Sequence, residues 1–121
     1  MSISVLTVDD SRTMRDMLRL ALTEAGFQVT QAEDGEHGLE VLAAHPPRVI
    51  ITDINMPRLD GFGFIEAVRR DERYRSIPIL VLTTESDADK KMRARQSGAT
   101  GWIVKPFDPH KLVAAIHRVA V

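Results

Sequence analysis

The chain has 121 residues, of which 44% are hydrophobic and 27% are charged, and this length predicts one domain, residues 1–121, with no room for a separate output domain. The net charge of −1 argues against nucleic-acid binding, and the absence of cysteine excludes disulfide scaffolds and thiol catalysis. No apolar run approaches the roughly 20 residues of a membrane span and no signal peptide is apparent, so we expect a cytoplasmic protein that does not enter a membrane.

The chain opens with a strand pattern followed by a helix pattern. Residues 3–8 are apolar and rich in β-branched side chains, and they end in Asp9, Asp10 and Ser11, which are good helix N-cap residues. The next segment repeats apolar residues at helical spacing, and Gly26 is expected as its C-cap. The stripe consists of Met14, Met17, Leu18, Ala21, Leu22 and Ala25.

The same alternation continues through the middle of the chain. Residues 27–32 predict a strand whose mixed polarity favours the edge of a sheet, and residues 35–44 predict a second helix. Residues 48–53 predict a buried strand that ends in a carboxylate, Asp53. A loop over residues 54–60 then leads to a third helix over about residues 61–70.

Two further strand and helix pairs complete the pattern. Residues 77–82 predict a strand followed by Thr83 and Thr84, with Pro78 tolerated near its start. A fourth helix is expected over about residues 86–97. Residues 100–104 predict a fifth strand, which ends before Lys105 and Pro106. The stripe of the last helix consists of Leu112, Val113, Ile116, Val119 and Ala120.

Five strands that alternate with five helices predict an α/β fold with a parallel sheet covered on both faces. Right-handed connections leave few topologies, and we expect a doubly wound five-stranded sheet in the order 2-1-3-4-5. In such a sheet the ligand crevice lies at the carboxyl ends of strands one and three, where the order reverses. Those ends carry Asp9, Asp10 and Asp53.

Three carboxylates in one crevice require a counter-charge. At separations of about 5 Å they repel one another by roughly 3 kcal/mol per pair at an effective dielectric constant near 20. Mg²⁺ is a suitable partner because it prefers oxygen ligands and is commonly bound by few carboxylates together with a phosphate. Lys105, at the end of the fifth strand, is a second candidate cation. Helix capping remains an alternative role for Asp9 and Asp10.

Asp53 is the candidate nucleophile, because a carboxylate can attack phosphorus to form an aspartyl phosphate while a metal ion and a lysine stabilise the transferring group. The Thr83 hydroxyl, at the neighbouring strand end, is a candidate donor to a phosphate oxygen. An ordinary β-branched strand residue is the alternative interpretation of Thr83.

At this point the sequence resembles the response-regulator receiver domains of two-component signalling over essentially its whole length. The motifs that carry the resemblance are VDDS at 8–11, TDINMPRLDG at 52–61, LTT at 82–84 and GATGWIVKPF at 98–107. The chain is most similar to single-domain chemotaxis regulators of the CheY type. Their fold is flavodoxin-like, with the strand order predicted above.

The resemblance implies a set of site residues. The implied Mg²⁺ ligands are Asp9, Asp10, Asp53 and the backbone carbonyl of Asn55. Asp53 would accept a phosphoryl group from a histidine kinase of the CheA type, and Thr83 and Lys105 would bind that group. The Lys105–Pro106 bond would be cis and would aim the lysine into the crevice. Such domains also phosphorylate themselves from small acyl phosphates and dephosphorylate themselves.

Other positions match those that tune the response in this family. Asn55, Thr84 and Glu85 correspond to residues that set the lifetime of the phosphoryl group, although Thr84 stands where Ala or Gly is commoner. Trp102 stands where the family has a mobile Tyr, Phe or His that moves with Thr83. Half-buried packing against a neighbouring helix is the alternative role for Trp102.

The predicted fourth helix is basic and poor in apolar residues, so it should pack weakly and shift readily. We expect it to form a partner-binding face with the fifth strand and fifth helix. The candidate surface residues are Lys90, Lys91, Arg93, Arg95 and Trp102. A merely solvated helix face is the alternative.

The expected target is the flagellar motor switch, and the chain is expected to act as a monomer. The sequence leaves open a phosphorelay intermediate, or a phosphate sink, that exchanges phosphate with a histidine phosphotransfer domain. An Asp-nucleophile phosphatase is disfavoured because Asn55 stands where a second acid is needed. A nucleotide-binding enzyme is disfavoured because no glycine-rich loop follows the first strand.

Overall fold

The computed structural model describes residues 2–120, which form a five-stranded parallel sheet in the order β2-β1-β3-β4-β5. The strands are β1 (Ser4–Val8), β2 (Gln28–Ala32), β3 (Val49–Thr52), β4 (Ile79–Thr83) and β5 (Gly101–Val104). The helices are α1 (Arg12–Glu24), α2 (Gly35–Ala44), α3 (Gly61–Arg70), α4 (Ala88–Ser97) and α5 (Pro109–Val119). This architecture confirms the predicted doubly wound fold, with β2 at an edge. None of the helices within residues 2–120 has the length and apolarity needed to cross a bilayer.

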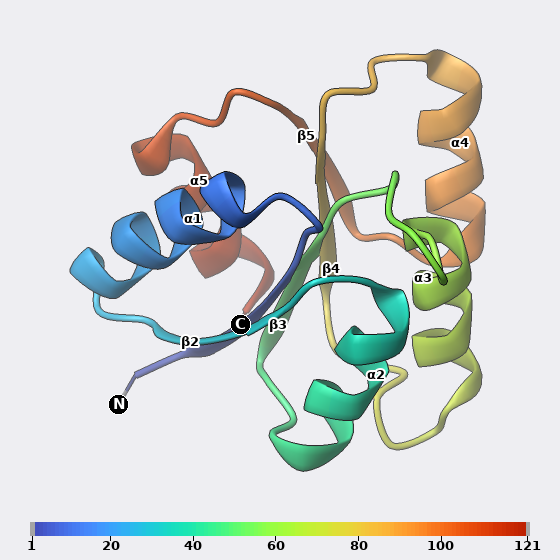
Figure 1. Ribbon diagram of the computed structural model, residues 1–121, viewed down its shortest axis with the longest axis horizontal. Helices are drawn as coiled ribbons and strands as arrows, with labels where there is room; N and C mark the ends of the chain where they lie inside the picture. Colours follow the sequence, from blue (N-terminus) through green and yellow to red (C-terminus); the bar gives the residue numbers. More distant parts are fainter. Residues whose placement is uncertain (1, 121) are drawn as a thin grey trace.

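Helices cover both faces of the sheet, with α1 and α5 on one face and α2, α3 and α4 on the other (Figure 1). Because strand side chains alternate between faces, neighbouring residues enter different cores. Val5 packs in the core that contains Leu18 of α1, whereas Leu6 packs in the core that contains Phe64 of α3. The sheet is therefore buried on both sides, and the residues free to bind a ligand lie at its ends.

Helix α1 buries less of its apolar stripe than the sequence predicts. Leu18 and Leu22 are buried, but the Met17 side chain is 49% exposed and Ala25 is also exposed. The stripe is wider than the surface that the sheet and α5 offer to this helix. Ser11 caps the helix as predicted, whereas Ala25 is the C-cap and Gly26, with φ 92°, lies one residue beyond it.

β4 and α4 each begin two residues later than predicted, whereas β1, β2 and β5 begin one residue later and β3 is one residue shorter at each end. β4 begins at Ile79 rather than residue 77, because Pro78 has no N–H for the ladder. The strand includes Thr83, which pairs with Val104 of β5. Pro78 still contributes its carbonyl, which accepts a hydrogen bond from the Ile50 N–H at 2.9 Å. Helix α4 begins at Ala88 rather than at residue 86, because the Asp87 carboxylate caps it by accepting from the N–H groups of the first turn.

Strand register places the residues that follow β1, β3, β4 and β5 at the same end of the sheet. Val8 pairs with Thr52, so the following residues, Asp9 and Asp53, leave the sheet side by side. The Asp53 N–H donates to the Val8 carbonyl at 2.9 Å. Across β4 and β5, Thr83 pairs with Val104, so Lys105 follows at the same end of the sheet.

Candidate functional site

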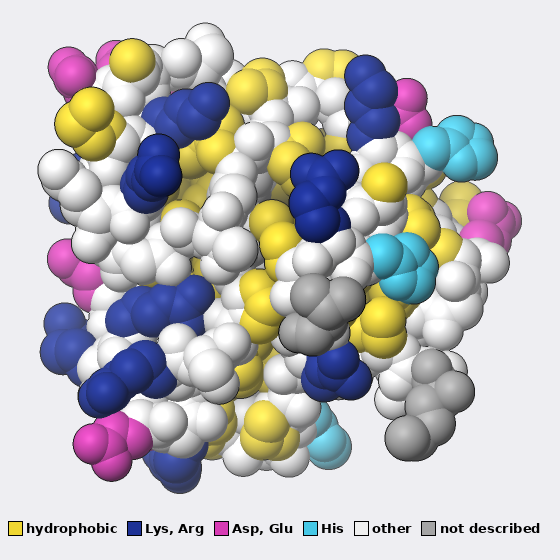
Figure 2. Space-filling view, turned by 180° about the vertical axis from the view of Figure 1, so that it is seen from behind, with side chains coloured by type: hydrophobic (Ala, Val, Ile, Leu, Met, Phe, Trp, Pro, Cys, Tyr) yellow, Lys and Arg dark blue, Asp and Glu magenta, His cyan; other side chains and the backbone are white. Residues whose placement is uncertain are grey.

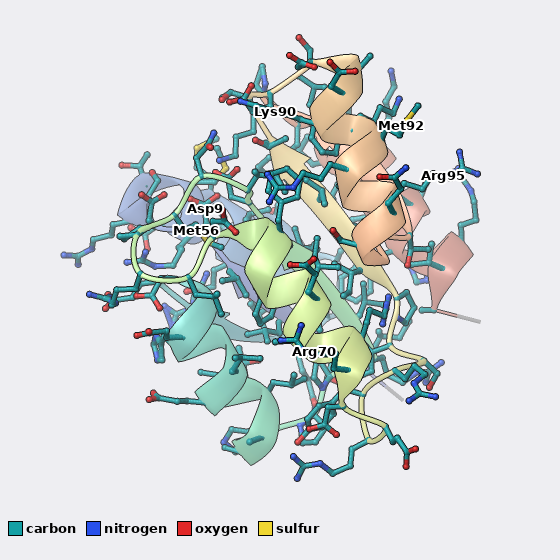
Figure 3. All side chains as sticks on the ribbon, turned by 90° about the vertical axis from the view of Figure 1, so that its right-hand side faces the viewer. Asp9, Met56, Arg70, Lys90, Met92 and Arg95 are labelled. Atoms are coloured by element: carbon teal, nitrogen blue, oxygen red, sulfur yellow. The ribbon has the colours of Figure 1, made fainter. Side chains whose placement is uncertain are left out.

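Three carboxylates converge where the strand order reverses. Asp9, Asp10 and Asp53 each offer an oxygen atom, and these atoms all lie within 4.8 Å of one another. Asp9 and Asp53 are buried, with 2% and 8% of their surface exposed, whereas Asp10 is exposed. The convergence predicted from the strand ends is confirmed. Figure 3 shows Asp9 at the end of the sheet where the loop that carries Met56 also lies.

Backbone and side-chain donors hold the two buried carboxylates in place. Asp9 Oδ1 accepts a hydrogen bond from the Ser11 N–H at 2.9 Å, and the Arg15 guanidinium donates to the Asp9 carbonyl at 2.7 Å. Asp53 Oδ1 accepts from the Ile54 N–H at 2.6 Å. Arg15 was not among the residues predicted for this site. Its position four residues after the Ser11 cap places it in the first turn of α1, close to the strand end.

Lys105 lies between the two buried carboxylates. Its Nζ donates to Asp9 Oδ2 at 2.9 Å and to Asp53 Oδ2 at 2.8 Å, and its side chain is only 10% exposed. The Lys105–Pro106 peptide bond is cis. The lysine therefore occupies the crevice in which the sequence predicted it.

The electrostatics of the cluster are unbalanced. Burial raises the pKa of Asp9, although the hydrogen bond from Lys105 opposes this effect. Burial by itself would lower the pKa of Lys105, but Asp53 and Asp9 together outweigh it and raise that pKa. At the largest separation of 4.8 Å and an effective dielectric constant near 20, two ionised carboxylates repel by about 3.5 kcal/mol, and closer pairs repel more strongly. One ammonium among three carboxylates leaves excess negative charge.

This donor set fits a hard divalent cation. The three groups supply carboxylate oxygens from two adjacent strand ends, and the excess charge of the cluster matches the charge of such an ion. The described residues present this cluster without a cysteine or histidine among its members, which favours an oxygen-preferring ion over zinc or copper.

Thr83 and Thr84 differ in their surroundings. Thr83 ends β4 and is fully buried, and its hydroxyl accepts a hydrogen bond from the Glu85 N–H at 3.3 Å. Thr84 is exposed. Within residues 2–120 the Thr83 hydroxyl has this one hydrogen bond, as acceptor, so it can donate its own proton to another group.

Glu85 connects the loop after β3 with α4 and β5, which are far apart in the sequence. Its Oε1 accepts from Asn55 Nδ2 at 3.0 Å and from Lys90 Nζ at 2.9 Å, and its backbone carbonyl accepts from Trp102 Nε1 at 3.2 Å. The hydrogen bonds from Lys90 and Asn55 lower the pKa of Glu85. Trp102 is half-buried against the core below α4, so it both packs and makes a polar contact.

A groove of about 480 Å³ lies between α4 and β5. Its lining includes Trp102, Met92, Lys91 and Arg95. Met92 and Arg95 project away from α4 (Figure 3), and Figure 2 shows Lys and Arg side chains on the side of the molecule that carries α4, with apolar side chains among them.

The basic residues of the predicted surface have three different roles. Lys91 and Arg95 line the groove, whereas Lys90 forms an ion pair with Glu85. The Arg93 guanidinium stacks over the Phe62 ring at 4.1 Å and so joins α4 to α3. Ala94 is the one residue of α4 that is fully buried, which agrees with the predicted weak packing of this helix.

Known proteins resemble this chain over almost its whole length. A family model described as the response regulator receiver domain matches residues 5–117. The probable chemotaxis protein CheY of Rhizobium etli is 42% identical, and the match covers 97% of this chain and 92% of that protein. The structure of the chemotaxis protein CheY4 of Vibrio cholerae has a TM-score of 0.93 at 44% identity, covering 98% of this chain and 99% of that one. The probable transcriptional regulator ycf27 of Guillardia theta is 38% identical, but the match covers only 44% of its length.

Proposed function

This chain belongs to the response regulator receiver domain family, and from that membership we propose that it is a phosphorylation switch whose acceptor is Asp53. The observation that carries the proposal is the cluster of Asp9, Asp10 and Asp53 with Lys105 in contact with two of them. A capping role alone would not require Lys105 to bridge two carboxylates from different strands.

In the proposed reaction a carboxylate oxygen of Asp53 attacks the phosphorus of a phosphohistidine on a histidine kinase. A phosphorus–oxygen bond forms, the phosphorus–nitrogen bond breaks, and the imidazole leaves with the electron pair. Lys105 Nζ, at 2.8 Å from Asp53, is placed to donate to the transferred group. Bound Mg²⁺ would neutralise negative charge on the phosphoryl oxygens. Its proposed ligands are Asp9, Asp10, Asp53 and the backbone carbonyl of Asn55.

Thr83 and Glu85 supply a route from the acceptor to the surface. When the Thr83 hydroxyl turns to donate to a phosphoryl oxygen, its contact with the Glu85 N–H changes. Glu85 in turn contacts Trp102 and Lys90, so a shift of this loop reaches β5 and α4. Asn55, Thr84 and Glu85 are the residues we propose to set the phosphoryl lifetime, since they lie on the two loops that follow β3 and β4.

We further propose that the protein works in the cytoplasm as a stand-alone, monomeric chemotaxis regulator that signals to the flagellar motor switch. Relatives named as chemotaxis proteins CheY match this chain along nearly their entire length. The groove between α4 and β5, with Trp102, Lys91 and Arg95, is the proposed partner surface.

Intact-mass measurement after incubation with acetyl phosphate and Mg²⁺ tests the acceptor. The wild-type protein should gain one phosphoryl group and lose it on standing, and Asp53→Asn should gain none. Asp108→Asn, which changes an exposed carboxylate that caps α5, is the matched control and should behave as wild type. A normal adduct on Asp53→Asn would show that the acceptor is wrong.

Incubation with flagellar motor-switch and histidine phosphotransfer proteins separates the possible targets. Beryllofluoride-treated protein should bind the motor-switch protein more tightly than untreated protein does. Rapid phosphate exchange with a phosphotransfer domain, without motor-switch binding, would instead indicate a relay intermediate or phosphate sink.

A further inference from the structure

The loop over residues 54–60, between β3 and α3, is tied at its far end to the start of α2. The Asp34 side chain is 1% exposed, and Asp34 Oδ2 accepts from Arg58 Nε at 2.8 Å and from Arg58 Nη2. Asp34 Oδ1 also accepts from the His37 N–H at 2.9 Å, which caps α2. One buried carboxylate thus serves both the helix and the loop.

The backbone around Arg58 has an unusual conformation, and backbone hydrogen bonds hold the loop as well. Arg58 has φ 64°, a left-handed conformation that residues other than glycine rarely adopt. Beside it, the Gly35 N–H donates to the Leu59 carbonyl at 3.0 Å, so α2 and the loop are also joined through their backbones. At the near end, the Gly61 N–H donates to the Ile54 carbonyl at 2.8 Å. Backbone hydrogen bonds therefore hold the loop both at Leu59 and across its base, between Ile54 and Gly61.

Three acidic side chains surround the Arg58 guanidinium and favour its position near the start of α2. Glu33 and Glu36 lie 3.4 Å and 3.9 Å from the guanidinium, but their side chains are more than half exposed. Asp34 is the buried member of this acidic group. It makes two hydrogen bonds to Arg58, so it is the partner best able to fix the orientation of the guanidinium.

The chain between Arg58 and Asn55 is short and stiff. Only Met56 and Pro57 separate the two residues, and the proline ring fixes one of the intervening backbone angles. Few free backbone angles therefore lie between Arg58 and Asn55, so the position of one restricts the position of the other.

We propose that Asp34 is a positioning residue for the metal site: through Arg58 it holds loop 54–60 and thereby sets the placement of the Asn55 backbone carbonyl. This inference rests on the proposed function, because it takes that carbonyl to be a ligand of Mg²⁺. It assigns to the start of α2 a role in metal affinity that none of its residues performs by direct contact.

Calorimetric titration with MgCl₂ alone tests this inference. Asp34→Asn retains a good N-cap but loses the charge that binds Arg58. Its dissociation constant for Mg²⁺ should rise by on the order of tenfold, as is typical when an outer partner of a metal site is lost. Glu36→Gln removes the same charge from the same guanidinium at an exposed position, and it should change the constant by less than about twofold because solvent screens exposed pairs.

Arg58→Asn separates positioning from simple charge effects. Loss of a cation near the site should tighten Mg²⁺ binding if only long-range charge matters, whereas loss of positioning should weaken it. Asparagine tolerates the left-handed conformation, so the loop is not newly strained. In the double variant the two losses should not add, because both remove one interaction.

The outcomes distinguish a failure of the positioning role from a failure of the metal site. Wild-type affinity in Asp34→Asn, or tighter binding in Arg58→Asn, would overturn the positioning role while leaving the metal site intact. Absence of any binding heat in the wild-type protein would overturn the proposed function and this inference with it. Circular dichroism at the titration temperature confirms that each variant is folded.

Discussion

Replacing Lys105 with methionine removes the cation that contacts both buried carboxylates while retaining a side chain of similar length. Each contact, at 2.8 Å and 2.9 Å, has a gross Coulomb energy of about 6 kcal/mol at an effective dielectric constant near 20. Desolvation of the lysine offsets much of that energy. Removing one partner of a buried ion pair typically destabilises a protein by about 3–5 kcal/mol, and we expect the lower value because Asp10 opens the cluster to solvent.

The expected loss of stability can be measured as a fall in melting temperature. Unfolding entropy of about 2.1 cal/mol/K per residue implies a fall of about 4 °C per kcal/mol for a chain of 121 residues. In buffer with EDTA, Lys105→Met should therefore melt about 12 °C below wild type. Addition of Mg²⁺ should raise the melting temperature of Lys105→Met more than that of wild type, because the variant cluster has more uncompensated negative charge.

Lys111→Met is the matched control, since Lys111 is an exposed lysine of α5 and its loss should leave the melting temperature within about 2 °C of wild type. Equal melting temperatures for the two variants in EDTA would show that Lys105 contributes no net stabilisation to the carboxylate pair, contrary to this prediction.

Three further outcomes are expected. Emission of Trp102, the sole tryptophan, should change when beryllofluoride is added with Mg²⁺, because its indole N–H donates to the Glu85 carbonyl; unchanged emission would exclude the Thr83–Glu85–Trp102 route. The hydrogen bond from the His37 N–H, with help from Arg58, lowers the pKa of Asp34 despite burial, so this carboxylate stabilises the fold above about pH 4 and loses that effect as pH falls further. Urea unfolding of Asp34→Asn should accordingly show a deficit at pH 7 that narrows below pH 4; a deficit independent of pH would contradict this. Gly98→Ala should lower stability by about 1–3 kcal/mol in urea unfolding, because Gly98 has φ 117° and a Cβ there would lie 2.6 Å from Arg69 Cγ.

Features that depend on neighbours along the chain were predictable from the sequence. The apolar runs and stripes predicted all ten elements, because burial of a strand or a helix face leaves a local pattern of period two or near 3.6. Parallel strands joined by right-handed crossovers then placed Asp9 and Asp53 at the same end of the sheet. Errors arose at ends, as at Pro78 and Asp87, where one hydrogen bond decides the boundary.

The link through Glu85 could not be predicted in this way. Asn55 lies on a loop, Lys90 on α4 and Trp102 on β5. No pattern along the chain shows that the first two contact the Glu85 carboxylate and that Trp102 contacts the Glu85 backbone carbonyl. Arg93 illustrates the same limit, since it belongs to a basic run but stacks on Phe62 of the neighbouring helix.

The pattern of residues along the chain was enough to predict the order of strands and helices, their amphipathic faces and the acidic residues at the strand ends. The contacts of Lys105 with Asp9 and Asp53, and of Asp34 with Arg58, became visible in the folded structure alone. Periodicity records which side of an element is buried, whereas contacts between loops depend on strand register and on side-chain conformations set by the packed neighbours.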